Sequence, residues 1–228
     1  RTREFIFPSL LHPNGCGFSL FRIDDPISEK EIINRLYDLK TKGIQVDEKL
    51  GKYDLMISNH FIDVMDLSEI NASIMHDYQD DLLNDSCYVL IHSSQQTEKQ
   101  KLSYWVQDEF ENIQTIFGNV QGLPSESAKD YFKFFEKVES YSKKKRLAIA
   151  ESLFGEDNVF CISDITHQGY FKEENNFVMR LGLANSQEKN GNLNRNLVPI
   201  AFNGYSLIYL YEGKPNINEG HLTINQLD

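Results

Sequence analysis

Cysteine, proline and tryptophan are scarce in this chain of 228 residues, which holds three cysteines, six prolines and one tryptophan. Three cysteines do not make a disulfide framework. Their low, odd number and the lack of a signal-like segment predict a reducing, cytoplasmic location. No apolar run approaches the roughly 20 residues of a membrane-spanning helix, so we expect no membrane partner.

Positive charge is also in short supply. Lysine and arginine total 23 against 34 aspartates and glutamates, which gives a net charge of −11. Such a chain is a poor non-specific binder of nucleic acid, because that binding comes from cations that neutralise phosphates. We interpret the basic run 143–146 accordingly, as a solvated helix face rather than an RNA contact.

The chain does contain enough apolar residues for a core, since hydrophobic residues make up 40% of it. Short β-branched and aromatic runs mix with longer helical patterns without strict βαβ alternation. This predicts an α+β fold in one domain covering residues 1–228. The expected strands are residues 5–11, 18–23, 61–65, 87–93, 159–163, 177–182, 198–202 and 206–211.

Four helices are expected. Ser28 and Glu31 form a capping box before an apolar stripe and place the start of the first helix at Ser28. The others are expected over residues 67–83, 98–117 and 125–154, with Gly155 as the stop of the last one. Cys87 and Cys161 fall inside strand-like runs, and we expect both to be small buried hydrophobic residues.

Three of the six histidines lie at the ends of expected strands. His60 opens the strand 61–65, His92 closes the strand 87–93, and His167 follows the strand 159–163. Cys16 stands between Gly15 and Gly17. Neutral imidazole and cysteinate are common metal ligands, so this set predicts a metal site, with scattered structural histidines as the alternative.

The residues around these positions resemble the RtcB family of RNA-splicing ligases, in the family's order. The Asn-Gly-Cys-Gly around Cys16 is similar to the family's Asp-Ile-Gly-Cys-Gly, and Asn-His-Phe-Ile-Asp-Val at 59–64 to its Asn-His-Phe-Ile-Glu-Val. Residues 88–93 resemble the strand that leads into its His-Ser-Gly-Ser-Arg-Gly, and 163–167 resemble its Asp-Val-Pro-His-Asn. Residues 198–206 are a fainter match to Ile-Pro-Gly-Ser-Met-Gly-Thr.

The resemblance implies a layered fold with mixed β-sheets and flanking helices around a central metal cleft. It also implies a metal- and GTP-dependent RNA ligase that joins 3′-phosphate or 2′,3′-cyclic phosphate ends to 5′-hydroxyl ends. The partners would be RNA ends, of tRNA or of damaged RNA, and the cofactors Mn²⁺ and GTP, with Zn²⁺ as the alternative metal. Such ions polarise phosphoryl oxygens and stabilise both the attacking and the leaving oxygen of an in-line displacement.

The same resemblance implies the role of each matching residue. Cys16 would bridge two metal ions, His60 would bind one of them, and His92 with His167 would bind the other. Asn59 would contact the guanylate phosphate. Asp63, which replaces a glutamate of the family, would contact the nucleotide.

The chain departs from the family in several places. Pro13 stands where the family has a metal-binding aspartate, and Asn14 or His12 is the candidate replacement. Residues 92–97 lack the glycines and the arginine of the family's His-Ser-Gly-Ser-Arg-Gly. The segment between Cys16 and His60 is shorter than is usual in the family. The Cys-His-Gly-Ala-Gly-Arg motif with the guanylated histidine is missing, which leaves His221 as the candidate nucleophile.

These departures support a second hypothesis, a non-ligating RtcB-like metal-binding or regulatory module that has lost the guanylation histidine. One thiolate is little negative charge for two divalent ions. We therefore expect one well-occupied metal held by Cys16, His92 and His167, with a weak or empty position near His60. The oligomeric state is not predicted.

Overall fold

The structure is a computed structural model of the chain. It describes residues 4–7, 14–56, 59–66, 87–95, 110–116, 118–173, 176–182, 189, 191–192, 197–201 and 208–212. Within these residues the fold is α+β, as predicted, with two α-helices and several antiparallel sheets. None of the described helices is long and apolar enough to cross a membrane.

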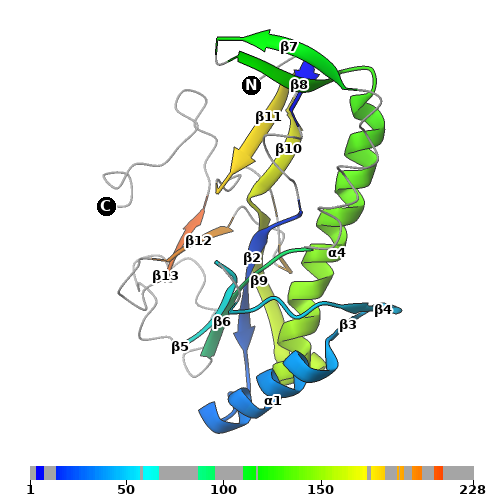
Figure 1. The fold of residues 1–228 in the computed structure, drawn as a ribbon. Helices are drawn as coiled ribbons and strands as arrows, with labels where there is room; N and C mark the ends of the chain where they lie inside the picture. The colour runs from blue at the N-terminus through cyan, green and yellow to red at the C-terminus, as the bar shows by residue number, and fades with distance from the viewer. Residues whose placement is uncertain are drawn as a thin grey trace.

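A four-stranded sheet forms the centre of the molecule (Figure 1). Its strands, in spatial order, are β5 (Phe61–Asp66), β6 (Cys87–Ser93), β2 (Gly17–Ile23) and β9 (Val159–Thr166). All three pairings are antiparallel. As a result the start of β2 lies beside the ends of both β6 and β9, and the start of β5 lies beside the end of β6.

Two helices accompany this sheet, α1 (Glu29–Lys42) and the long α4 (Ala128–Phe154). The Ser28 side chain accepts a hydrogen bond from the Glu31 backbone N–H, as the capping box predicts. Gly155 ends α4 at φ 97°, a conformation that favours glycine. A short 3₁₀ helix, η3 (Glu156–Asn158), leads into β9.

The main core lies between the sheet and these helices. It uses the side chains of β2 and β6 that alternate onto one face, and the stripe of α4 that faces them. Its members include Phe21, Ile23, Val89, Ile91, Ile149 and Leu153. Cys87 is buried in this core, as expected. Cys161, which we expected to be buried too, is half-buried and packs against the core.

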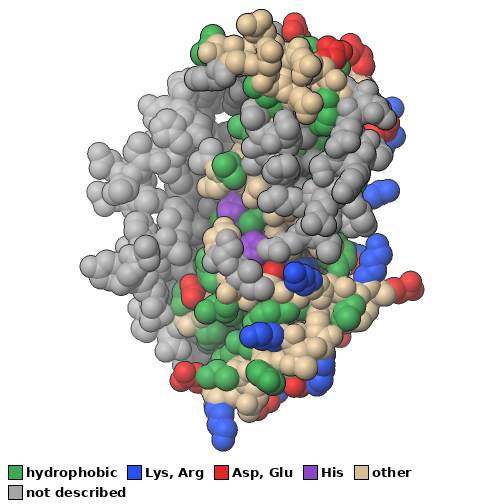
Figure 2. Space-filling model, in the orientation of Figure 1, with side chains coloured by type: hydrophobic (Ala, Val, Ile, Leu, Met, Phe, Trp, Pro, Cys, Tyr) green, Lys and Arg blue, Asp and Glu red, His purple; other side chains and the backbone are tan. Residues whose placement is uncertain are grey.

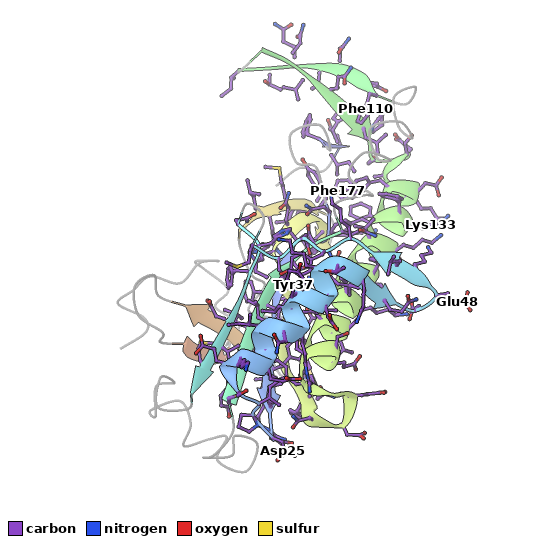
Figure 3. All side chains as sticks on the ribbon, turned by 60° about the horizontal axis from the view of Figure 1, so that its bottom comes forward. Asp25, Tyr37, Glu48, Phe110, Lys133 and Phe177 are labelled. Carbon is purple, nitrogen blue, oxygen red and sulfur yellow. The ribbon has the colours of Figure 1, made fainter. Side chains whose placement is uncertain are left out.

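A second, aromatic core surrounds the N-terminal half of α4. It includes Tyr131, Phe135 and Tyr170, and the partly buried Phe110 and Phe177 that Figure 3 labels. Around it lie β1 (Phe5–Ile6), β7 (Glu111–Thr115), β8 (Gly118–Pro124), β10 (Gln168–Glu173) and β11 (Asn176–Leu181). Two further hairpins are β3 (Ile44–Val46) with β4 (Lys49–Gly51), and β12 (Leu197–Ala201) with β13 (Ile208–Glu212).

Three predictions about the elements were wrong. Residues 111–115 of the expected helix 98–117 form strand β7, whose partner β8 supplies backbone hydrogen bonds that a helix would have supplied internally. The expected mixed sheets are antiparallel in every pairing of the described strands. The basic run is only partly a solvated face, because Lys144 is exposed while Lys145 and Arg146 are buried. The expected helix 67–83 lies outside the described residues.

Candidate metal centre

Cys16 immediately precedes β2 and is held in place by its neighbours. The Asn14 side-chain oxygen accepts a hydrogen bond of 3.0 Å from the Cys16 backbone N–H. The Cys16 carbonyl accepts another, also of 3.0 Å, from the backbone N–H of His167. Gly15 adopts φ 66°, a left-handed conformation, and Gly17 packs directly against the backbone of β9. The two glycines therefore allow β2 to start directly after Cys16, with the thiol directed at His60 and His92.

The Cys16 thiol contacts two imidazole rings. Its Sγ atom lies 3.4 Å from Nε2 of His60 and 3.2 Å from Nε2 of His92. Nε2 of His92 lies in turn 3.0 Å from Nε2 of His167. The antiparallel order of the sheet explains why residues so far apart in sequence meet. Each of them lies at the same end of the sheet, where β2 and β5 start and β6 and β9 finish.

The ligand atoms of Cys16, His60 and His92 all lie within 4.8 Å of one another. These three side chains are between 3% and 5% exposed, while His167 is half-buried. Histidine atoms reach the surface at the middle of the face drawn in Figure 2. The cluster is thus largely removed from water yet lies close to one surface.

The far nitrogens of two rings face acceptors. Nδ1 of His92 lies 2.8 Å from the Asn59 carbonyl oxygen, and Nδ1 of His60 lies 2.7 Å from a carboxylate oxygen of Asp54. The Asn59 oxygen places the ring proton of His92 on Nδ1, which leaves its Nε2 lone pair directed at the Cys16 sulfur. The His60 contact lacks hydrogen-bond geometry, and there the negative charge of Asp54 favours the proton on Nδ1. An acceptor behind each ring is the arrangement that metal-binding histidines usually have.

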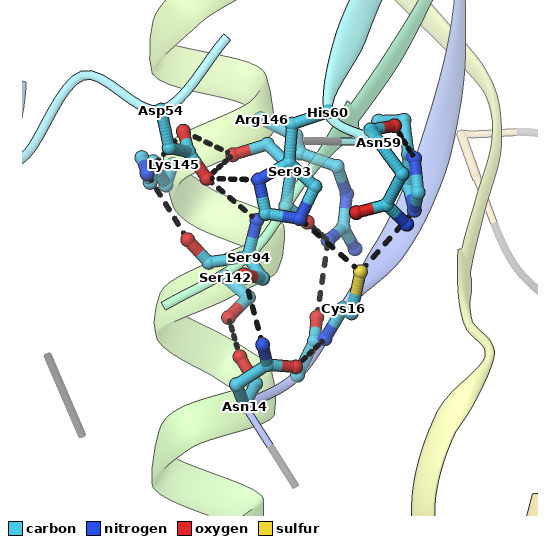
Figure 4. Close-up of polar contacts among 12 residues, drawn as sticks. Asn14, Cys16, Asp54, Asn59, His60, Ser93, Ser94, Ser142, Lys145 and Arg146 are labelled. Carbon is cyan, nitrogen blue, oxygen red and sulfur yellow. Dashed lines mark hydrogen bonds and ion pairs between the residues drawn. The ribbon is translucent and has the colours of Figure 1, made fainter. Parts of the chain in front are cut away.

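Asp54 is the centre of a buried polar network (Figure 4). Its carboxylate accepts hydrogen bonds from Lys145 at 2.6 Å, from the Ser93 hydroxyl at 2.9 Å and from the Ser94 backbone N–H at 3.2 Å. Both Asp54 and Lys145 are 1% exposed. Sequence reasoning missed these two residues, because no local pattern marks an aspartate in a loop or a lysine inside a basic run.

Arg146, the next residue on α4, supports the Cys16 side of the centre. It donates to the backbone oxygens of Gly15 and Ser93 at 3.3 and 3.2 Å, and it pairs with Asp164. The guanidinium is fully buried, so its donors need these partners. It therefore ties the loop of Cys16 to the end of β6.

Burial controls the charge of the candidate ligand atoms when no cation is bound. It raises the pKa of the Cys16 thiol to about 11, although nearby Arg146 opposes the shift. It lowers the pKa of His92, and it lowers that of His167 to about 4 with help from the neighbouring His92. Burial would also raise the pKa of Asp54, but His60 and Lys145 outweigh it and lower that pKa to about 2.

The cluster has fewer protons than contacts. If Nδ1 of His60 and of His92 hold their protons, only the Cys16 thiol and the His167 ring can place protons between the facing atoms. Three contacts join the sulfur and the three Nε2 atoms, and two protons serve at most two of them. A metal ion held by Cys16, His60 and His92 satisfies the facing lone pairs of these three residues at once. Ligand atoms around a tetrahedral zinc ion lie about 3.3 to 3.5 Å apart, close to the spacing seen here.

The other predicted site residues have different outcomes. The Asn59 side chain is exposed beside His60, and only its backbone oxygen joins the cluster. Asp63 is exposed on β5, where burial of part of its carboxyl group raises its pKa. The cluster includes His60, at which we expected the weaker metal position. His12, Pro13 and His221 lie outside the described residues.

Comparisons of the chain with models of known protein families, with curated proteins and with solved structures find no match.

Proposed function

We propose that this protein is an RtcB-like RNA ligase that joins RNA 3′-phosphate or 2′,3′-cyclic phosphate ends to 5′-hydroxyl ends with a divalent metal ion and GTP. One observation carries the proposal: a buried thiol at the start of β2 contacts the Nε2 atoms of two histidines from two other strand ends. The motifs that resemble the ligase family are centred on these same residues.

The donor set fits a transition metal. Cys16, His60 and His92 would hold one ion, and His167 stands beside His92 to extend the set. A divalent ion bound there supplies Lewis acidity toward phosphoryl oxygens. Asp54 and the Asn59 carbonyl oxygen lie behind the His60 and His92 rings and orient their ligand atoms. Burial of these side chains keeps water away from the ligand atoms.

The donor chemistry also bears on which ion is preferred. Thiolate and imidazole suit Zn²⁺, whereas Mn²⁺ favours sites with carboxylate oxygens. The carboxylate nearest to the cluster among the described residues, Asp54, is already committed to Lys145, Ser93, Ser94 and His60. We therefore expect Zn²⁺ to bind more tightly than Mn²⁺, even if Mn²⁺ supports the reaction.

The second candidate function is a metal-binding or regulatory module without ligase activity. It is favoured by Pro13 in place of an aspartate and by His221, which lacks the glycines of the guanylation motif. In that case Cys16 and the histidines would keep the metal, but no residue would carry the guanylate. The two candidates share the metal centre and differ in nucleotide chemistry.

The experiment that separates them is incubation with radiolabelled GTP and Mn²⁺, followed by ligation of an RNA with 3′-phosphate and 5′-hydroxyl ends. A ligase forms an acid-labile histidine–guanylate adduct and joins the ends, and Cys16→Ser abolishes the joining. Cys161→Ser is the matched control, since Cys161 packs against the core away from the cluster. Bound metal without adduct or joining in the native chain would select the module, and no bound metal would contradict both candidates.

A further inference from the structure

Lys145 is a buried cation for which the proposed function has no role. Its side chain is 1% exposed, and its ammonium group donates to Asp54 at 2.6 Å and to the Ser94 carbonyl oxygen at 3.0 Å. Its neighbour Lys144 shows how unusual this is, because that side chain is 53% exposed and pairs with Asp47 at the surface. A buried ammonium is costly unless it is paired and hydrogen-bonded, as Lys145 is.

The two oxygens of Asp54 share the Ser93 hydroxyl, which lies 2.9 Å from Oδ1 and 3.1 Å from Oδ2, but differ in their other partners. Oδ1 accepts from Lys145 at 2.6 Å. Oδ2 lies 2.7 Å from Nδ1 of His60 and accepts from the Ser94 backbone N–H. Lys145 thereby occupies the oxygen that His60 does not use. The carboxylate is held from two sides, by Lys145 of α4 and by Ser93 and Ser94 at the end of β6, so its orientation toward the His60 ring depends on both.

We propose that Lys145 is a positioning residue of the metal centre, which acts through Asp54 to fix the His60 ring with Nε2 aimed at the Cys16 sulfur. The inference rests on the metal centre of the proposed function and goes beyond it by assigning a residue that touches no ligand atom. A carboxylate behind a histidine fixes the ring and raises its basicity as a ligand. Without Lys145, Asp54 is a buried anion that lacks its cation and turns toward other donors.

A purely structural role for Lys145 makes a different prediction. If the ammonium only balances the charge of Asp54, Lys145→Met loses stability, but the folded variant binds metal as the native protein does. If Lys145 positions His60 through Asp54, the folded variant also loses metal affinity, because the carboxylate behind the ring is no longer held in place. The two roles therefore separate on metal binding rather than on stability.

The test compares Lys145→Met with Lys144→Met in the full chain, using Co²⁺ as the probe. Co²⁺ reports its ligands through a thiolate charge-transfer band and through d–d bands. We expect Lys145→Met to weaken Co²⁺ binding about 10- to 100-fold, the usual effect of losing such support. The charge-transfer band of Cys16 should persist while the d–d bands shift. Lys144→Met should match the native protein in both affinity and spectrum.

The double variant Asp54→Asn/Lys145→Met keeps the test decisive if Lys145→Met does not fold. We expect it to unfold at a temperature near that of the native protein and still to bind Co²⁺ weakly. Native affinity and d–d bands in either folded variant would overturn the positioning role and leave the metal centre standing. A native chain that binds neither Co²⁺ nor Zn²⁺ would overturn the metal centre itself, and this inference with it.

Discussion

Gly17 of β2 packs so tightly against Ile165 of β9 that a Cβ atom at position 17 would lie 2.1 Å from the Ile165 carbonyl oxygen. The same glycine pairs with Ser93 on the other side, so it stands between the strand ends that carry His92 and His167. The approach of these strands, and with it the convergence of the ligand atoms on Cys16, depends on the absence of a side chain there.

Gly17→Ala should therefore lower the free energy of unfolding and weaken metal binding together. The added methyl group must push β9 away, and overpacking of this kind costs about 1 to 3 kcal/mol. Chemical denaturation and Zn²⁺ titration measure the two effects. Gly118→Ala is the control, since a Cβ at Gly118 meets nothing within 4 Å and only its φ of 103° is unfavourable. It should lose some stability without any change in metal affinity.

Metal affinity should rise with pH by about tenfold per unit between pH 6 and 8. Burial holds the pKa of Cys16 near 11, so the free protein carries a thiol in this range, and binding must expel one proton. The pKa of His167 is lowered to about 4 and that of His92 is also lowered, so both shifts favour neutral rings and reduce their contribution to the slope. Competition titrations with a chelator at several pH values give this slope. An affinity independent of pH would mean that Cys16 is not a ligand.

His60→Ala and His167→Ala should differ in their effect on bound Zn²⁺. His60 belongs to the group whose ligand atoms converge on Cys16, while His167 contacts that group through His92. We expect His60→Ala to remove most of the metal and His167→Ala to weaken it less. Elemental analysis of the dialysed variants tests this order. The reverse order would support the assignment from the motifs, in which Cys16, His92 and His167 hold the stronger site.

Arg146→Met should destabilise the fold by about 3 to 5 kcal/mol, the usual result of removing one partner of a buried ion pair. It would remove the ion pair of Arg146 with Asp164 and the hydrogen bonds of Arg146 to the backbone oxygens of Gly15 and Ser93. Urea denaturation measures the change. Lys133→Met removes an exposed pair with Asp130 on the same helix and should change stability by less than about 0.5 kcal/mol. Equal effects of the two substitutions would mean that the Arg146 network contributes little.

Local patterns in the sequence determined much of the framework. The strand 87–93 was predicted with its observed bounds, because seven buried side chains make one continuous β-prone run. Ser28 and Glu31 marked the start of α1, since a cap is a contact between residues three apart. The pattern failed at residues 111–115, where the strand depends on a partner, β8, and not on the segment itself.

The candidate ligands were also readable, since Cys16, His60, His92 and His167 each sit at the end of a β-prone run. That they meet at one edge follows from the antiparallel order β5-β6-β2-β9, which the runs alone do not specify. The supports behind them were decided by the tertiary structure alone. Lys145 and Arg146 read as surface cations because a basic run is normally solvated. They are buried because α4 packs against this sheet, where Asp54 and Asp164, 91 and 18 positions away, neutralise them.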